Sequence, residues 1–161
     1  MIQPIRRAVF ATLFVFAIAA PVCAQVRTPS YREFRVDAID GRGTSVQGGA
    51  GFTVPMGIYV RLAALGGIGP QWRDGETVLA GRTDVIARFL LDPFRQSPVG
   101  LSIGGGVSVP YEKGTHVRPY LTAVVDVEGH RHGKLTPALQ VGLGGGVRVG
   151  IVLRTSVLRR R

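Results

Sequence analysis

The chain has 161 residues, of which 45% are hydrophobic and 19% are charged, and it carries a formal net charge of +10. The high apolar content excludes an intrinsically disordered chain, although glycine contributes 23 residues. The surface of a soluble domain is about 25–35% charged, so this composition argues against an ordinary cytosolic enzyme. A chain of this length is expected to form one domain with its own core.

Residues 1–24 have the three parts of a secretory signal peptide. Arg6 and Arg7 supply the positive start, residues 8–20 are apolar, and Val22-Cys23-Ala24 is a small-residue cleavage site. The apolar run is shorter than the roughly 20 residues that a spanning helix needs. We therefore expect cleavage after Ala24, which leaves residues 25–161 as the mature domain and removes the chain's one cysteine.

Short segments of alternating apolar and polar residues follow the signal peptide. In the clearest one, Val85, Ala87 and Phe89 alternate with Asp84 and Arg88. This period of two predicts strands, because a helix would space its apolar residues three and four apart. Turn-forming residues separate eight such segments. The expected strands cover residues 31–39, 44–54, 57–67, 78–91, 99–110, 117–128, 135–145 and 147–158.

Three stretches in this part of the chain, 46–54, 101–109 and 141–149, share a glycine-rich pattern. A phosphate-binding loop is a poor explanation, since the third glycine of the dinucleotide motif and the Lys-Ser pair of a P-loop are both missing. Glycine can instead relieve bending strain in a closed barrel. It also supplies small residues opposite long arginine side chains, because an eight-stranded barrel is only just wide enough for its interior side chains.

The alternation alone allows a membrane barrel, a lipocalin-like soluble barrel or a sandwich. The polar face favours the first, because its charges are sparse and nearly balanced, as expected of a paired interior rather than a solvated surface. Arginine suits such pairing, since its planar fork can hold two carboxylate oxygens. We therefore predict an apolar face toward lipid and a charged face in the lumen. The predicted lumen-facing residues are Glu33, Asp37, Asp84, Asp126, Glu128, Arg35, Arg61, Arg82, Arg88, Arg118, Arg148 and Arg154.

From about Tyr31 to Leu158 the chain resembles the small eight-stranded outer-membrane β-barrels of the OmpA and OmpX type. The resemblance rests on the signal peptide, the number and length of strands, the hairpin at residues 51–60 and the strand opening at Pro119-Tyr120. It implies an all-β, antiparallel, up-and-down transmembrane barrel over residues 25–161. It also implies location in the outer membrane of a Gram-negative-type bacterium, insertion as a monomer, and no catalysis.

Aromatic residues near strand ends are expected to form a thin girdle at the membrane interfaces. These are Tyr31, Phe52, Tyr59, Trp72, Phe89, Phe94 and Tyr111.

Candidate chemistry is sparse. His130 and His132 could supply two metal ligands, and His116 lies further along the chain, but no third ligand is evident. The His-x-Ser pair of the outer-membrane lipid A deacylases is absent, so we predict no catalytic, cofactor-binding or metal site. The positive charge is not interleaved with aromatics, which argues against nucleic acid as a partner. Outer-membrane lipid or lipopolysaccharide is the expected partner.

Three functions remain open from the sequence. The first is a structural outer-membrane barrel whose lumen is plugged by arginine–carboxylate pairs. The second is an exported soluble barrel or sandwich that binds a small apolar ligand, with the apolar face inside. The third, an enzyme acting on membrane lipids, would need a lipid-facing His-Ser or similar pair. The turns are all expected to be modest, and the longest is predicted at about Gly66 to Thr77.

Overall fold

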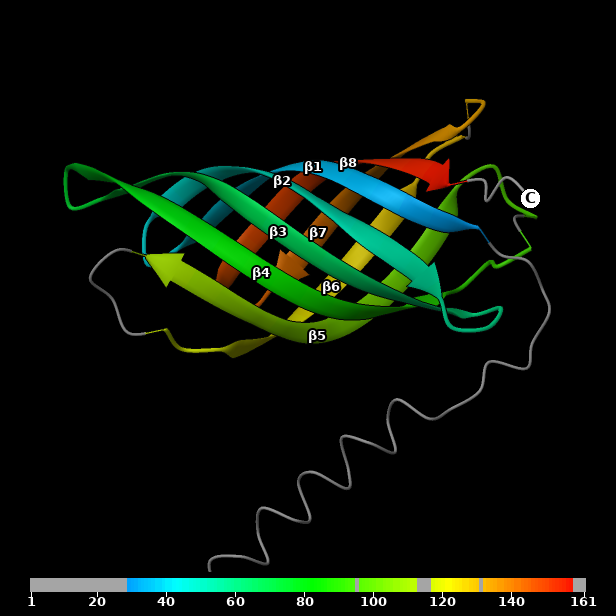
Figure 1. The fold of residues 1–161 in the computed structure, drawn as a ribbon, viewed down its shortest axis with the longest axis horizontal. Coiled ribbons are helices and arrows are strands. Elements are labelled where there is room, and N and C mark those ends of the chain that lie inside the picture. Colours follow the sequence, from blue (N-terminus) through cyan, green and yellow to red (C-terminus); the bar gives the residue numbers. More distant parts are fainter. Residues whose placement is uncertain (1–28, 95, 113–116, 131, 158–161) are drawn as a thin grey trace, which may run out of the picture.

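The computed structural model describes residues 29–94, 96–112, 117–130 and 132–157. These residues form eight antiparallel strands that pair in chain order, and the last strand pairs with the first to close a barrel (Figure 1). The predicted eight-stranded up-and-down barrel is confirmed, whereas the predicted signal peptide lies outside the described residues. The strands are β1 (Ser30–Gly41), β2 (Thr44–Pro55), β3 (Val60–Arg73), β4 (Glu76–Leu90), β5 (Gly100–Glu112), β6 (Tyr120–Glu128), β7 (Leu135–Leu143) and β8 (Gly146–Val157).

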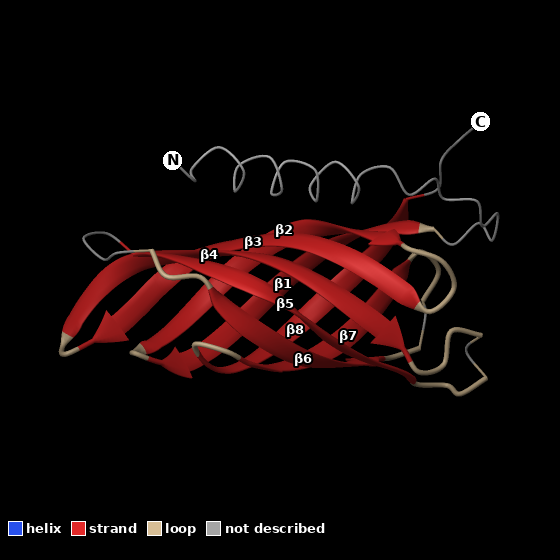
Figure 2. Cartoon of the chain, turned by 90° about the horizontal axis from the view of Figure 1, so that it is seen from below, coloured by secondary structure: helices blue, strands red, loops and turns tan. Residues whose placement is uncertain are grey.

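The strands are tilted along an elongated barrel with two different ends (Figure 2). One end, here called the terminal end, holds the start of β1, the end of β8, the connection at 56–59 and the facing ends of β4, β5, β6 and β7. The other end, called the hairpin end, holds two-residue turns after β1, β3 and β7, together with the end of β5 and the start of β6. Among the described residues, no helix is long and apolar enough to cross a membrane.

The longest predicted turn, between Gly66 and Thr77, is wrong. β3 continues to Arg73, and β4 begins at Glu76, so only Asp74 and Gly75 form the turn. Both have positive φ angles, 52° and 82°, as the tight hairpin turns that suit twisted strands require. The glycines that suggested a loop instead belong to the sheet, where they pair with β2 and β4.

The two faces of the barrel wall differ sharply. Apolar side chains alternate along every strand and face outward, with Leu121 80% exposed and Ile151 64% exposed. Charged side chains face inward, with Glu33 fully buried and Arg154 1% exposed. The buried apolar cluster is small and comprises Ala63, Leu65, Ile86 and Val124. The wall is therefore apolar outside and mainly polar inside.

Interior glycines make room for the arginines. A Cβ atom on Gly142 would lie 3.2 Å from Nε of Arg148. One on Gly104 would lie 3.1 Å from Cγ of Arg88 and only 2.5 Å from the backbone oxygen of Ala87, so close backbone approach also requires glycine there. Glycine in these strands thus lets long side chains cross an interior that is otherwise too narrow.

Aromatic side chains gather outside the terminal end of the barrel. Tyr59 stacks on Phe89 with ring centres 5.7 Å apart and meets the edge of Phe94 at 6.5 Å. Tyr31 was predicted in the same girdle, and this placement is wrong. Its position in β1 points inward, where it is 6% exposed and lies beneath the guanidinium of Arg61 at 4.9 Å.

Candidate functional site: the charge network inside the barrel

The interior of the described barrel contains buried ion pairs contributed by β1, β3, β4, β6 and β8. Because side chains alternate across each strand, every second residue of a strand faces the lumen. The pairs form two clusters, one toward each end of the barrel. Eleven of the twelve residues predicted to face the lumen are buried in these clusters, and Arg118 is not.

The cluster at the terminal end holds three acids and three arginines. Glu33 accepts hydrogen bonds from Nη1 of Arg88 at 2.6 Å and from Nε of Arg154 at 2.9 Å. Glu128 accepts from Nη1 of Arg154 and from Nη1 of Arg61, both at 2.7 Å. The third acid, Asp126, is paired with Arg88 and Arg154. Formal charge is therefore balanced within this terminal-end cluster.

The cluster toward the hairpin end holds two acids and three arginines. Asp37 pairs with Nε of Arg35 at 2.7 Å and with Nη2 of Arg82 at 2.9 Å. Asp84 pairs with Nε of Arg82 at 3.1 Å and with Nη1 of Arg148 at 2.7 Å. One positive charge exceeds the carboxylates in this hairpin-end cluster. Nη1 of Arg35 and both Nε and Nη2 of Arg148 are buried without a hydrogen-bond partner.

Gln140 joins the two clusters, and its role was missed by the sequence analysis. Its side-chain oxygen accepts from Nη2 of Arg35, while its Nε2 donates to Asp126 at 2.6 Å. The residue is fully buried. The period-two pattern of segment 135–145 could have placed Gln140 on the inner face, but only the strand register shows what it bridges.

Small hydroxyl side chains complete the network, and the sequence analysis did not single them out. Thr53 donates to Glu33 at 2.6 Å, and Ser108 donates to Asp84 at 2.5 Å. Each hydroxyl comes from a strand next to the one that carries its carboxylate. These bonds matter because buried carboxylates must have their oxygens satisfied for the ion pairs to be tolerated.

The prediction that Arg118 faces the lumen within a strand is wrong. β6 begins at Tyr120, and Arg118 lies before it, exposed, in the connection from β5. Pro119 stands immediately before β6 and has no N–H group to donate to the strand ladder, which favours a strand start after it. Arg118 instead lines a cavity at the hairpin end.

That cavity, here called the hairpin-end cup, has a volume of about 350 Å³. Its wall combines interior residues with residues of the turns at this end of the barrel. The polar residues that matter for its chemistry are Arg42, Gln47, Arg82, Glu112, Arg118 and Tyr120.

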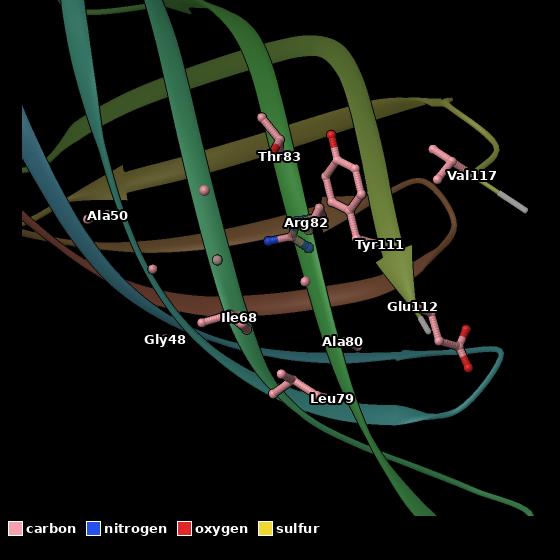
Figure 3. Close-up of a pocket in the computed structure, with 14 residues that line it drawn as sticks. Gly48, Ala50, Ile68, Leu79, Ala80, Arg82, Thr83, Tyr111, Glu112 and Val117 are labelled. Carbon is pink, nitrogen blue, oxygen red and sulfur yellow. The ribbon is translucent and has the colours of Figure 1, made fainter. Parts of the chain in front are cut away.

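A second hollow lies against β2, β3 and β4 and has a volume of about 790 Å³ (Figure 3). Much of its floor is made of small residues, and Ile68 and Leu79 stand at one side of it. A Cβ atom on Gly48 would meet no atom within 4 Å, so packing within this chain does not require glycine there. The small residues of the floor are Gly48, Ala50, Gly66 and Gly81.

The histidines do not form a metal site within the part of the chain that the structure describes. The rings of His130 and His132 lie edge to face at 5.5 Å, and Nδ1 of His132 is 3.1 Å from the carbonyl oxygen of His130. No group of three potential ligand residues is found among the described residues. His116 lies outside them.

Comparisons with known proteins inform the fold alone. No protein-family model and no curated protein sequence matches the chain. A de novo designed transmembrane β-barrel is similar in structure, with a TM-score of 0.54 and 16% identity over 81% of this chain and 98% of the design. Neisserial surface protein A also has a TM-score of 0.54, with 13% identity over 80% of this chain and 96% of its own. The predicted resemblance to eight-stranded outer-membrane barrels is confirmed at the level of fold.

Proposed function

We propose that this barrel of the transmembrane type spans a bacterial outer membrane as a structural protein with a plugged lumen. The observation that carries the proposal is the inverted distribution of side chains, with ion pairs inside and apolar residues outside. Export through a cleaved signal peptide, insertion as a monomer and contact with membrane lipid or lipopolysaccharide belong to the same proposal. No catalytic role is assigned.

The outer face supports burial in lipid. Leu79, Leu121 and Ile151 are each at least 64% exposed, and they belong to a belt of outward apolar residues that runs around the barrel. In water, contiguous apolar patches of more than a few hundred Å² are rare on monomers. In a bilayer the same belt is matched by hydrocarbon, and a closed barrel leaves no backbone edge to be satisfied by lipid.

The inner face supports a plugged lumen. Arg88 reaches Glu33 from β4, which is not a neighbour of β1 in the barrel wall, so its side chain lies across the interior. An eight-stranded barrel is wide enough only for such side chains, and an aqueous channel needs many more strands. Ions would have to displace several buried pairs to pass, which is costly.

The alternative of a soluble barrel with an apolar ligand inside receives little support. Such a protein would need apolar side chains around an internal cavity. The buried apolar cluster is instead limited to Ala63, Leu65, Ile86 and Val124, and buried charges lie on both sides of it along the barrel.

Fractionation followed by gel migration with and without boiling tests the location. We expect recovery in the outer membrane and a mobility shift on heating, because a closed barrel resists detergent until it is boiled. A soluble periplasmic protein without a shift would overturn the proposal. Conductance of the purified barrel in planar bilayers tests the plug, and we expect no regular single-channel steps, whereas reproducible steps would contradict it.

A further inference from the structure

The hairpin-end cup is a pocket enclosed by the barrel mouth. It lies above the hairpin-end cluster, and Gln47 and Arg82 belong both to the interior and to the cup lining. Its volume of about 350 Å³ lies within the range of small-molecule sites. Tyr120 also lines the cup, and its ring packs against the backbone of Gly145. A Cβ atom on Gly145 would lie 2.5 Å from Cζ of that ring.

The charges that line the cup are mainly positive. Three arginines, Arg42, Arg82 and Arg118, face one carboxylate, Glu112. That carboxylate is already engaged, because Nη1 of Arg73 lies 3.3 Å from its Oε1. Within the described part of the chain, neither Arg42 nor Arg118 forms an ion pair.

The hairpin-end cluster, which lies beneath the cup, also has an excess of positive charge. It contains three arginines and two carboxylates, whereas the terminal-end cluster is balanced. Arg148 is 4% exposed, yet its Nε and Nη2 have no hydrogen-bond partner. In the sheet register it pairs with Ile39, which lines the cup, so it lies at the level of the cup floor. Arg61, Arg88 and Arg154 of the terminal-end cluster each have one such nitrogen too, so these donors accompany the excess positive charge beneath the cup but are not specific to it.

We propose that the hairpin-end cup binds the phosphate group of a small, water-soluble molecule. The planar guanidinium groups of Arg42 and Arg118 can donate paired hydrogen bonds to phosphate oxygens. Arg82 can add its Nη1, because its Nε and Nη2 already hold Asp84 and Asp37. A multiply charged phosphate suits a cavity lined by three arginines better than a single carboxylate does. The source is soluble, because the cup lies within the ring of strands while lipid headgroups lie outside it.

Calorimetric titration of the folded, detergent-solubilised barrel with pyrophosphate tests this site. We expect saturable binding of one ion, weakened about tenfold or more by Arg42→Gln combined with Arg118→Gln, since each removes a charged donor. Arg32→Gln is the matched control, because Arg32 is exposed near the opposite end of the barrel. Equal weakening by Arg32→Gln, or no saturable binding, would overturn the proposal.

A second variant separates a shaped site from general attraction of anions. Ala80 lines the cup and is 4% exposed, so Ala80→Leu fills part of the cup without changing its charge. We expect Ala80→Leu to weaken pyrophosphate binding. Unchanged binding would mean that pyrophosphate is an adventitious ion only and would overturn the proposal. Acetate binding as tightly as pyrophosphate would indicate a carboxylate site and contradict the proposal.

The lipid source is tested separately with mixed micelles of the same detergent and phosphatidic acid. Competition of these micelles with pyrophosphate would contradict a soluble source, and we expect none. These assays use the barrel in a neutral detergent, so they do not depend on where the protein resides in the cell. Absence of pyrophosphate binding would overturn the phosphate site but not the proposed membrane role. Recovery of the protein in the soluble fraction would overturn the membrane role but not the phosphate site.

Discussion

Arg154 and Glu33 are direct cross-strand partners at the junction of β8 and β1, and Nε of Arg154 donates to Oε1 of Glu33 at 2.9 Å. The two residues are 121 positions apart in the chain. Their pair therefore fastens the first strand to the last, at the place where the barrel closes. Glu33 also holds Arg88 from the opposite side, so one carboxylate organises two buried arginines.

Glu33→Gln is expected to destabilise the barrel by about 1–3 kcal/mol, because it removes one carboxylate charge from Arg88 and Arg154, which keep their pairs with Asp126. The measurement is urea unfolding of the barrel in detergent, followed by gel mobility. Glu76→Gln is the control, since Glu76 is exposed beside the turn after β3, and it should change stability by no more than about 0.5 kcal/mol. Equal stability of both variants would show that the interior pair contributes nothing.

Asp84→Ala is expected to cost more stability than Asp126→Ala. Asp84 is the one carboxylate paired with Arg148 among the described residues, so its loss leaves a buried cation unpaired, at a cost of about 3–5 kcal/mol. Asp126 shares its arginines with Glu33, so its loss should cost about 1–3 kcal/mol. Heat-modifiable migration and urea midpoints measure both. Unchanged folding of both variants would refute a lumen held by ion pairs.

A double variant checks the reason for that difference. If the cost of Asp84→Ala comes from an unpaired cation, then Arg148→Met in the same chain should recover part of the lost stability. Strictly additive losses would mean that the two residues do not interact, and the distance of 2.7 Å between their charged atoms would then lack energetic consequence.

Gln140→Leu tests the link between the two clusters. The substitution keeps the approximate size of the side chain but removes one acceptor from Arg35 and one donor to Asp126. We expect a loss of about 1–3 kcal/mol in the free energy of unfolding, because both partners remain buried. Thr77→Ala is the control, because it changes an exposed position near the hairpin tip and should be nearly neutral.

The number of strands and the identity of the inner face could be predicted because both depend on local alternation. In β4, for example, Asp84 and Arg88 alternate with Val85 and Phe89, and a period of two assigns each set to one face. Several boundaries differ from the prediction, most of all the end of β3, where the local composition resembles a turn. The glycines before Arg73 are held in the sheet by tertiary pairing, and Pro119 delays the start of β6 past Arg118.

The partners inside the lumen could not be predicted from the sequence. Arg35 pairs with Asp37, two residues away, whereas Arg61 pairs with Glu128, 67 residues away. Which residues meet depends on the stagger between strands around the closed barrel, and alternation contains no information about that stagger. The bridging role of Gln140 and the excess charge beneath the cup depend on the same stagger.

Two glycines from the similar glycine-rich segments should respond oppositely to alanine. A Cβ atom on Gly106 would lie 2.8 Å from Cα of Ile86, which is backbone that cannot move aside, so Gly106→Ala should cost about 1–3 kcal/mol. A Cβ atom on Gly48 would meet nothing within 4 Å, so Gly48→Ala should be tolerated, with a gain of up to about 1 kcal/mol. Urea unfolding compares the two, and equal losses would mean that backbone flexibility, rather than space, explains these glycines.

The outward apolar belt should be sensitive to charge according to depth. Ile151 lies at the middle of β8, 64% exposed and paired in register with Val36 and Leu139. Ile151→Arg should cost about 2–4 kcal/mol if this face lies in hydrocarbon, whereas Leu79→Arg, near the hairpin tip, should cost about 0–1 kcal/mol. Unfolding of both variants in phospholipid vesicles measures the difference. In water, arginine at either exposed position would be nearly neutral, so equal and small effects would show that the outer face does not meet lipid.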